Sequence, residues 1–492
     1  MIQGSAFAGK TYAVLGLARS GLATVDALLA SGATVVAWDS NEAARAKILP
    51  GTGRGTGVAG GGVASSDTQP SKLPLHHPAD GPPPRSGEDL VLADPLETDL
   101  TGFAGVVVSP GVPLNKHPIS AHAAKFGVPI IGDIELFAQA RPDLPPHKVV
   151  GITGTNGKST TTALIHHILQ TADIPSLMGG NIGLPIMGRD PLPAGGVYVL
   201  ELSSYQIDLT FSLDCDVAVL TNITPDHLDR YNGFEGYVAS KLRLFEMQDP
   251  SHIGVFNWHT EFGQKLYREL TESGEREIWT NYDDNVVDPY DLWGPFDENG
   301  HTASRDHLST QPDWPSLQGP HNAQNAISAI LAASALGIAD ETISQALRTY
   351  SSLPHRMERI AERGGVLFVN DSKATNATAT APALAAYPAV HWILGGQPKS
   401  DDLDDCAPHF DHVRAAYTIG TAGPMFARIL REAGKTVTES GTLAQAVKDA
   451  AAAAKPGEVV MLSPACASFD QFSDYEARGD AFRIAVKGLG LC

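Results

Sequence analysis

The sequence is organised around the stretch Lys148-Val-Val-Gly-Ile-Thr-Gly-Thr-Asn-Gly-Lys-Ser-Thr-Thr-Thr162. An apolar run rich in β-branched residues ends in a glycine-bearing loop, and residues 163–170 follow with apolar residues at helical spacing. The pattern predicts a strand, a phosphate-binding loop and a helix. Glycines let backbone N–H groups close around phosphate oxygens, and the positive end of the helix dipole favours negative charge there.

The individual loop residues have chemistry that suits a nucleotide. Lys158 supplies a mobile positive charge, and the Ser159 hydroxyl can reach Mg²⁺. The spacing is not the usual G-x-x-x-x-G-K-[ST], because Ile152 stands five residues before Gly157, so Gly154 is the first glycine of a shortened G-x-x-G-K-S loop. A glycine turn that only begins a helix is the alternative, and Lys-Ser-Thr directly after the glycines argues against it. The predicted phosphate-binding residues are Gly154, Thr155, Asn156, Gly157, Lys158, Ser159 and Thr160.

The composition limits the classes of protein to which the chain can belong. Its 492 residues suggest about three domains, and 43% hydrophobic and 18% charged residues are typical of a globular protein with an ample core. The 35 Lys and Arg residues stand against 55 Asp and Glu, a formal net charge of −20. Nucleic acids and anionic membranes need a basic face, so we expect neither as a partner, whereas small anionic substrates need only local positive charge.

Cysteine usage and the N-terminus indicate the compartment. The four cysteines are widely spaced, without a pairing or metal-binding pattern, which is typical of reduced thiols in a cytoplasmic protein. The N-terminus lacks a basic region with a cleavage site, and no apolar run reaches the ~18 residues of a membrane-spanning helix. We therefore expect a cytoplasmic protein without signal peptide or membrane span, and we expect a monomer.

The N-terminal segment predicts a Rossmann-type βαβ unit. A strand at residues 11–15 runs into the turn Gly16-x-x-x-x-Gly21 and a helix, and a second strand at residues 34–38 ends at Asp39. The middle glycine of G-x-G-x-x-G is absent, which argues against a dinucleotide and favours a nucleotide-like or other phosphate-bearing ligand. A further strand ends in the turn Ser109-Pro110-Gly111, whose backbone N–H groups could bind an anion; a plain bend is the equal alternative.

Linkers and low-complexity segments divide the chain. Residues 51–90 hold nine glycines and six prolines, and we interpret them as a flexible insertion because this composition buries too little surface to offset its ordering entropy. Proline-rich residues 141–147 form a first linker, and Leu353-Pro-His-Arg356 marks a second boundary. The predicted domains are residues 1–146, 147–352 and 353–492.

Two more strands of the central domain deliver polar residues. A strand at residues 197–201 ends in Glu201, and a strand at residues 217–221 is followed by His227. The C-terminal ends of parallel strands share one edge of a sheet, so Ser159, Glu201 and His227 should converge there. Hydroxyl, carboxylate and imidazole are suitable ligands for Mg²⁺ or Mn²⁺ beside a triphosphate. A structural role is the alternative for a lone histidine after a strand.

The remaining segments extend the α/β pattern. A nearly all-apolar helix over residues 319–337 carries Asn322 and Asn325 one turn apart, where they could pair with a purine edge or cap the helix. After residue 356, strands alternate with helical stretches, which predicts a third parallel unit. The expected fold is α/β, with a Rossmann-like N-terminal domain, a central P-loop ATPase-type domain with a mostly parallel sheet, and a Rossmann-like C-terminal domain.

Taken together, these motifs resemble the Mur ligase family, the ATP-dependent amide ligases of bacterial peptidoglycan precursor synthesis. The resemblance covers all three predicted domains, and its last two segments favour the D-glutamate-adding branch. The segments that carry it are Ser109-Pro-Gly111, Gly151-Ile-Thr-Gly-Thr-Asn-Gly-Lys-Ser-Thr160, Gly180-Asn-Ile-Gly183, Glu201-Leu-Ser-Ser-Tyr-Gln206, Asp226-His-Leu-Asp-Arg-Tyr231, Ser240-Lys-Leu-Arg243, His321-Asn322, Leu353-Pro-His-Arg356, Asp371-Ser-Lys-Ala-Thr-Asn376 and Ser463-Pro-Ala-Cys-Ala-Ser-Phe-Asp-Gln-Phe472.

The resemblance implies a ligase that uses ATP and two Mg²⁺ ions to join D-glutamate to UDP-N-acetylmuramoyl-L-alanine. Lys158, His227 and Lys241 would be catalytic. The metal ligands would be Ser159, Glu201, His227 and Lys241, the last as a carbamate. Beyond the phosphate loop, ATP would contact Asn322, Asn325, Arg356, Asp371 and Lys373, with His355 at the same hinge. The two substrates would contact Asp39, Ser109, Pro110, Gly111, Asn181, Ser203, Thr375, Lys399, Ser468, Phe469 and Tyr475.

Some alternatives stay open at this point. A lysine beside Arg243 on a helix is usually a solvated surface charge, which is the alternative for Lys241. Gln397-Pro398 stands where the family pattern has Asp-Gly, so the alignment of Lys399 is in question. For function, the alternatives are a ligase for another amino acid, folylpolyglutamate synthase, or a P-loop nucleotide switch that hydrolyses nucleotide only to change partners.

Overall fold

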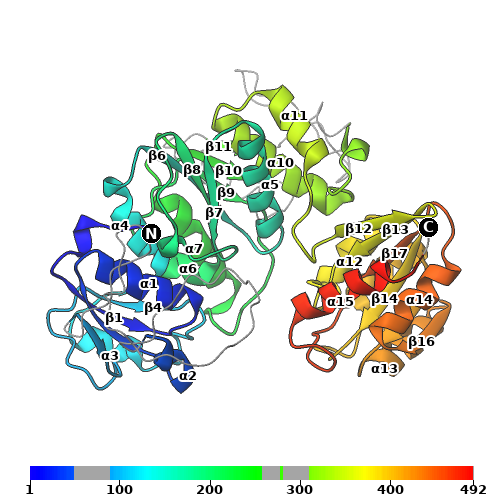
Figure 1. Ribbon diagram of the computed structural model, residues 1–492, viewed down its shortest axis with the longest axis horizontal. Helices are drawn as coiled ribbons and strands as arrows, with labels where there is room; N and C mark the ends of the chain where they lie inside the picture. The colour runs from blue at the N-terminus through cyan, green and yellow to red at the C-terminus, as the bar shows by residue number, and fades with distance from the viewer. Residues whose placement is uncertain (49–88, 257–277, 281–309, 491–492) are drawn as a thin grey trace, which may run out of the picture. The chain divides into compact units, whose positions relative to one another are not determined.

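A computed structural model of the chain describes residues 1–48, 89–256, 278–280 and 310–490 (Figure 1). The described residues carry three β-sheets with flanking helices. They fall into two compact units. The first comprises Met1–Gly154, Ile174–Ala218 and Thr224–Gly254, and the second comprises Thr155–Asp173, Val219–Ile223 and Val255–Cys492.

The N-terminal sheet is parallel throughout, with the strand order β3-β2-β1-β4-β5. Its strands β1 and β4 are buried apolar runs, as in sheets that are covered on both faces. Ile119 and Ala123 of α3 pack against Ala13 and Val106 on one face. The elements are β1 Thr11–Leu15, α1 Arg19–Ala30, β2 Thr34–Trp38, α2 Glu42–Arg45, β3 Leu90–Leu92, β4 Gly105–Val108, α3 Ile119–Lys125, β5 Ile130–Ile131 and α4 Asp133–Ala140.

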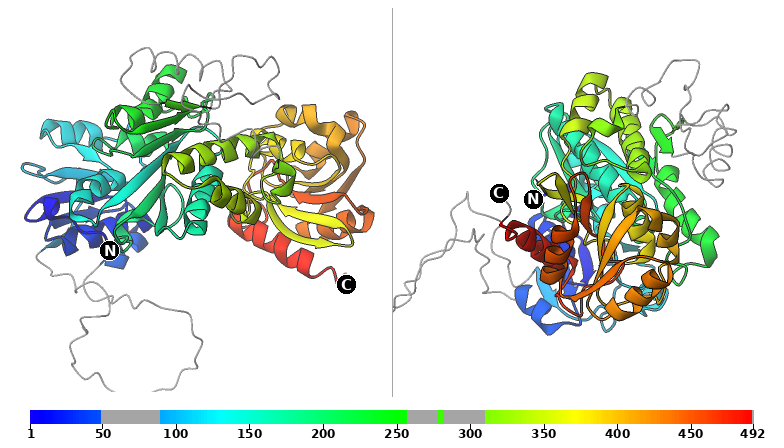
Figure 2. Two further views of the ribbon diagram at one scale, coloured as in Figure 1. Left: turned by 90° about the horizontal axis from the view of Figure 1, so that it is seen from above. Right: turned by 90° about the vertical axis from the view of Figure 1, so that its right-hand side faces the viewer.

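The central sheet has the order β11-β10-β9-β6-β8-β7, which places the strand before the phosphate loop between β8 and β9. Strand β6 pairs with β8 in parallel, and Ile152 lies opposite Glu201. Helices α10 and α11 pack beside α5 (Figures 1 and 2). The elements are β6 His147–Thr153, α5 Lys158–Thr171, β7 Ser176–Gly180, β8 Gly196–Glu201, α6 Ser204–Asp208, β9 Val217–Leu220, α7 Gly233–Glu246, β10 Ile253–Phe256, β11 Ile278–Thr280, α10 Pro320–Ala335 and α11 Asp340–Thr349.

The C-terminal sheet has the order β12-β13-β17-β14-β15-β16, with β12 antiparallel to β13. Two apolar clusters fill its two faces: α12 and α13 contribute to one, and α14 and α15 to the other (Figure 1). The elements are β12 Glu358–Arg363, β13 Val366–Asn370, α12 Ala377–Ala385, β14 Val390–Gly395, β15 Val413–Ile419, α13 Gly423–Glu432, β16 Val437–Gly441, α14 Leu443–Ala453, β17 Val459–Leu462 and α15 Tyr475–Lys487.

Short 3₁₀ helices connect these elements. They are η1 Ser5–Phe7, η2 Ala46–Ile48, η3 Arg141–Asp143, η4 Ile186–Gly188, η5 Gln311–Asp313 and η6 Asp404–His412. Among the described helices, none combines the length and the apolar character that a membrane crossing requires.

The α/β fold with mostly parallel sheets confirms the predicted fold class, and one local prediction needs correction. The predicted insertion at residues 51–90 lies outside the described residues as far as residue 88. At its end, however, Leu90 is buried and begins β3, which pairs with β2, so the insertion cannot extend to residue 90. The predicted domain boundaries remain predictions.

A buried carboxylate fastens α4 to the loop after α6. Glu135 is 4% exposed. Its Oε2 accepts hydrogen bonds from the backbone N–H groups of Phe211 at 2.7 Å and Ser212 at 3.0 Å, and its Oε1 accepts one from the Ser212 hydroxyl at 2.8 Å. Hydrogen bonds to a charged group are worth about 1.5–3 kcal/mol, so these contacts tie the N-terminal sheet to the central one within the first unit.

We expect Glu135→Ala to lower the stability of the chain by roughly 3 kcal/mol, because it removes hydrogen bonds to a buried carboxylate and opens a cavity. Glu97→Ala, at an exposed position of the same unit, is the matched control and should change stability by less than about 0.5 kcal/mol. Denaturant unfolding of both variants beside wild type measures the effect. Equal midpoints for the two variants would show that the Glu135 contacts do not stabilise this junction.

Candidate active site

The phosphate loop leaves β6 at Thr153 and enters α5 at Lys158. Gly154 and Gly157 have φ angles of 143° and 83°, which only glycine adopts without strain. A Cβ atom at Gly157 would also collide with the side-chain oxygen of Asn325. Lys158 Nζ donates a hydrogen bond to the Thr155 carbonyl at 2.8 Å, so the lysine closes over its own loop.

Residues after β9 hold the middle of this loop. The Asn222 carbonyl accepts the Thr155 N–H, and the Asn222 side chain hydrogen-bonds to both the N–H and the carbonyl of Asn156. Thr221 Oγ1 donates to the same Asn156 carbonyl. Asn222 is not among the predicted site residues; its place directly after a strand of the same sheet was the available signal.

Glu201 ends β8 and is 2% exposed. Its Oε1 accepts a hydrogen bond from Asn181 Nδ2 at 2.8 Å, and its Oε2 has no hydrogen-bond partner among the described residues. A buried carboxylate oxygen without a partner is costly unless a cation or donor completes it. Glu201 therefore fits the predicted role of metal ligand, although no group of three His, Cys, Asp or Glu residues that could hold a metal occurs in the described part of the chain.

Lys241 lies on the buried face of α7, with 1% of its surface exposed. This burial contradicts the alternative of a solvated surface charge. Lys241 Nζ donates to the Gly154 carbonyl at 2.7 Å and lies 4.6 Å from the centre of the Tyr237 ring. The predicted catalytic lysine thus contacts the first glycine of the phosphate loop.

His227 is less enclosed than the other predicted ligands. Its side chain is 48% exposed, with Nε2 3.6 Å from the neighbouring Asp226 carboxylate. Its ring lies 5.1 Å from that of Tyr205 and 6.3 Å from that of Tyr237, measured between centroids. Tyr237 therefore lies beside both His227 and Lys241, whereas the predicted convergence of Ser159, Glu201 and His227 stays a prediction.

The two predicted adenine residues are buried at the start of α10. Gly319 is the N-cap of this helix, so the capping alternative for Asn322 and Asn325 is wrong. Asn325 Nδ2 donates to Asn322 Oδ1 at 3.3 Å, and Asn322 Nδ2 donates to the Gln318 carbonyl at 3.0 Å. Asn325 also approaches Gly157, which brings the predicted adenine residues to the phosphate loop within the second unit.

The segment from His355 to Met357 is conformationally unusual. His355 and Met357 have φ angles of 63° and 46°, in the left-handed region. Arg356 between them donates from Nη2 to Ser159 Oγ at 3.0 Å, so two residues predicted to act on ATP and metal meet. Lys373 Nζ lies 3.8 Å from the centre of the Tyr475 ring.

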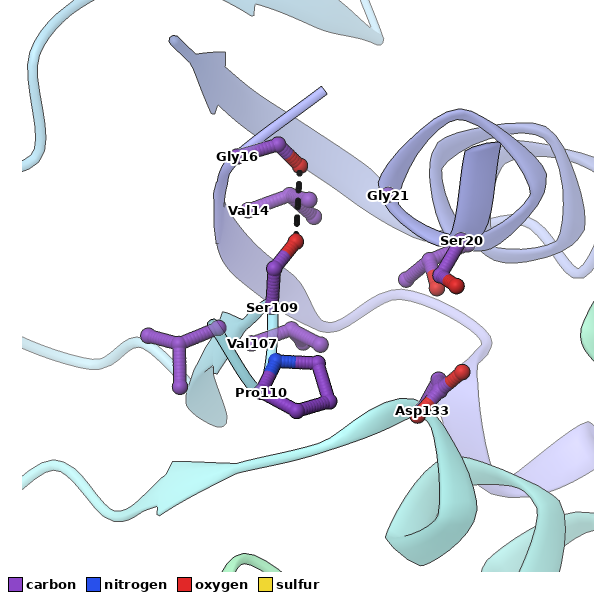
Figure 3. A pocket seen from close by; sticks show the side chains of 10 residues that line it. Val14, Gly16, Ser20, Gly21, Val107, Ser109, Pro110 and Asp133 are labelled. Atoms are coloured by element: carbon purple, nitrogen blue, oxygen red, sulfur yellow. Dashed lines mark hydrogen bonds between the residues drawn. The ribbon is translucent and has the colours of Figure 1, made fainter. Parts of the chain in front are cut away.

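The predicted UDP-sugar residues line the edge of the N-terminal sheet. Asp39 accepts hydrogen bonds from the backbone N–H groups of Leu17 at 2.6 Å and Asn41 at 2.8 Å, and so stabilises the turn after β1. Ser109 and Pro110 border a cavity of about 10 Å³, room for one water molecule (Figure 3). Gly111 follows them and is exposed. Ser203, a predicted substrate residue outside this sheet, caps α6 by accepting a hydrogen bond from the Gln206 N–H.

A buried carboxyl borders the same cavity (Figure 3). Asp133 is 7% exposed, and its Oδ1 has no hydrogen-bond partner among the described residues. Burial raises its pKa from 3.8 to about 6. Asp133 is not among the predicted site residues, since an acidic residue in the first turn of a helix is an ordinary feature.

Two of the predicted D-glutamate residues are in direct contact. Lys399 Nζ donates to Thr375 Oγ1 at 3.2 Å. The backbone of Gln397 pairs with Ala467 in both directions, at 2.9 and 3.0 Å, which ties the loop with the unexpected Gln397-Pro398 to the residue before Ser468. Ser468 is 2% exposed, whereas Phe469 is 69% exposed.

The carboxyl of Asp371 makes stability pH-dependent. Burial raises its pKa from 3.8 to about 7, and hydrogen bonds from Ser463 and Met357 and the charge of Arg356 oppose the shift. The folded chain therefore holds this proton to a higher pH than the unfolded chain. The stabilisation from the protonated group is complete below about pH 4 and is lost as the pH rises to about 7.

We expect Asp371→Asn, which keeps the shape of the side chain without its ionisation, to remove this decline. The measurement is the midpoint of thermal unfolding of wild type and variant between about pH 4 and about pH 8. Relative to the variant, wild type should lose stability as the pH rises through this range, and the contribution of Asp133 cancels because both proteins share it. A difference that does not change with pH would contradict a raised pKa at Asp371.

Comparison with known proteins adds independent information. Residues 152–333 match the model of the Mur ligase middle domain, and residues 355–466 match that of the Mur ligase glutamate ligase domain. A UDP-N-acetylmuramoylalanine–D-glutamate ligase of Novosphingobium aromaticivorans is 57% identical over 99% of this chain and 97% of that protein. The protein of the same name from Zymomonas mobilis is 54% identical over 99% of this chain and 100% of its own length.

Solved structures support the fold. A UDP-N-acetylmuramate–alanine ligase of Thermotoga maritima aligns over 97% of this chain and 99% of its own, with a TM-score of 0.51 and 15% identity. MurF of Acinetobacter baumannii aligns over 79% of this chain and 90% of its own, with a TM-score of 0.50 and 18% identity. The matches of both domain models and the full-length similarity to the two ligases show that this chain belongs to the Mur ligase family.

Proposed function

We propose that this chain is an ATP-dependent ligase that joins D-glutamate to UDP-N-acetylmuramoyl-L-alanine in peptidoglycan precursor synthesis. The observation that carries the proposal is the high identity, over nearly the whole chain, to ligases named for this reaction. Mur ligases are ATP-dependent, and the phosphate loop with Lys158 at the start of α5 is suited to that nucleotide.

The proposed reaction begins with activation of a carboxylate. A carboxylate is a poor electrophile, so the substrate oxygen first attacks the γ-phosphorus of ATP, which forms an acyl phosphate and releases ADP. The amine of D-glutamate then attacks the acyl carbon, and the tetrahedral intermediate expels phosphate. Both steps concentrate negative charge, which Lys158, Arg356 and the N-terminus of α5 can stabilise.

We assign the metal role to Ser159, Glu201, His227 and Lys241. Bound Mg²⁺ would supply positive charge beside the phosphates. The buried Glu201 Oε2 without a partner and the short contact from Lys241 to the loop support this assignment. A carbamate on Lys241 would turn a buried cation into an anion, which a second Mg²⁺ can pair with.

The two substrates are assigned to the outer domains. Residues 1–146 would bind the UDP-sugar through Asp39 and the turn Ser109-Pro110-Gly111, and Asn181 and Ser203 of the central domain would also contact a substrate. Residues 353–492 would bind D-glutamate, and residues 147–352 would bind ATP. The D-glutamate residues would be Thr375, Lys399, Ser468, Phe469 and Tyr475, of which Thr375 and Lys399 already share a hydrogen bond.

We place the enzyme in the cytoplasm as a monomer without a membrane or nucleic-acid partner. Its proposed substrates are small molecules, and a net charge of −20 disfavours binding to nucleic acid or to an anionic membrane. The proposed chemistry uses residues of a single chain.

The test of the function is ADP release with and without each substrate. We expect release to require both D-glutamate and UDP-N-acetylmuramoyl-L-alanine, because the acyl phosphate forms only on the bound sugar nucleotide and turns over only with the amine. A panel of other amino acids and acceptors separates this enzyme from other Mur-type ligases and from folylpolyglutamate synthase. ADP release that neither substrate changes would instead indicate a P-loop nucleotide switch.

We expect Lys241→Ala to lose nearly all activity and acetate or formate to restore part of it. A small carboxylate can occupy the position of the proposed carbamate in the space that truncation opens. Activity of wild type and variant is measured over a range of acetate concentrations, with chloride at equal ionic strength as the control. Full activity of Lys241→Ala without added acid would remove Lys241 from the mechanism.

A further inference from the structure

The residue after Thr221 contacts the phosphate loop at several points. The Asn222 carbonyl accepts the Thr155 N–H at 2.9 Å. Asn222 Oδ1 accepts the Asn156 N–H at 2.9 Å, and Asn222 Nδ2 donates to the Asn156 carbonyl at 3.0 Å. Thr221 Oγ1 donates to that carbonyl as well, at 2.7 Å.

These bonds use the hydrogen-bonding capacity of the Asn156 peptide groups completely. The N–H has one acceptor, and the carbonyl oxygen, with two lone pairs, has two donors. Asn156 itself is exposed, so its backbone would otherwise bond to water. The middle of the loop therefore cannot rotate without breaking several hydrogen bonds at once.

The shortened loop needs such a support. Only Thr155 and Asn156 stand between Gly154 and Gly157. Both glycines adopt positive φ angles, and because they lack a Cβ atom their backbones are less restricted than those of other residues. The hydrogen bond from Lys158 to the Thr155 carbonyl restrains this segment at one residue, and the Asn156 peptide groups need a separate restraint. Hydrogen bonds from the neighbouring strand end supply one, and asparagine alone offers an acceptor and a donor side by side at this reach.

We propose that Asn222 is a positioning residue for the nucleotide phosphates. By holding the Asn156 peptide, it orients Gly157 and the first N–H groups of α5, which then donate to the phosphate oxygens. The N–H groups of Thr155 and Asn156 already have acceptors and do not take this role. The inference rests on the proposed function and deepens it. It names a residue that fixes the conformation of the phosphate-binding loop and that need not touch the nucleotide.

The test compares Asn222→Ala and Asn222→Asp with Thr442→Ala. The last substitution removes the N-cap of α14, a helix that packs on the C-terminal sheet. Binding of Mg·ADP and of UDP-N-acetylmuramoyl-L-alanine is measured by calorimetry, and the hydrogen exchange of residues 155 and 156 by mass spectrometry. We expect both Asn222 variants to bind Mg·ADP about tenfold or more weakly, with UDP-sugar affinity unchanged and exchange at 155 and 156 faster. Thr442→Ala should leave all three values at those of wild type.

The aspartate variant makes the test stricter, because it keeps Oδ1 as an acceptor for the Asn156 N–H and places a second acceptor against the Asn156 carbonyl. Wild-type affinity for Mg·ADP in Asn222→Ala or Asn222→Asp would overturn the inference. Equal weakening of Mg·ADP and UDP-sugar binding would also overturn it, since that result indicates a general loss of structure. If wild type itself bound no Mg·ADP, the proposed function would fail together with this inference.

Discussion

Hydrogen bonds to the carbonyl groups of the phosphate loop are the interaction on which the site depends. A phosphate repels carbonyl oxygens and attracts N–H groups, so a short loop binds it only if its carbonyls point elsewhere. In this chain Lys241 donates to the Gly154 carbonyl, and Lys158 donates to the Thr155 carbonyl. Thr221 and Asn222 both donate to the Asn156 carbonyl. These hydrogen bonds fix the orientation of the loop carbonyls, and a loop that is fixed in this way binds phosphate at a lower entropic cost.

This organisation explains why charged and polar groups are buried here. Lys241 is 1% exposed. Burial of its ammonium group costs folding free energy unless hydrogen-bond acceptors or other partners surround it. The Gly154 carbonyl and the face of Tyr237 are such partners. Glu201, by contrast, keeps an oxygen without a partner among the described residues, which is typical of a site that is completed by a ligand.

The fold and part of the site could be predicted from sequence because their signals are local. The β6–loop–α5 unit, the first βαβ unit and the C-terminal sheet each show hydrophobic periodicity and glycine turns. The edge strands β12 and β16, by contrast, are half polar and carry no apolar run that would identify them as strands. The burial of Lys241 could not be predicted from the helix that contains it, because Arg243 follows two residues later and the buried face depends on packing. Asn222 was missed because asparagine after a strand is common and its partners are distant in sequence.

The central claim is that ATP activates the carboxylate of the sugar nucleotide. The most direct measurement uses UDP-N-acetylmuramoyl-L-alanine labelled with oxygen-18 in its carboxylate, with ATP and D-glutamate, and determines the isotope content of the released phosphate by mass spectrometry. An acyl phosphate carries one carboxylate oxygen into the phosphate when the amine attacks, so the account predicts one labelled oxygen per phosphate formed from fully labelled substrate. Phosphate without the label would show that water, not the carboxylate, takes the phosphoryl group, and would contradict the account.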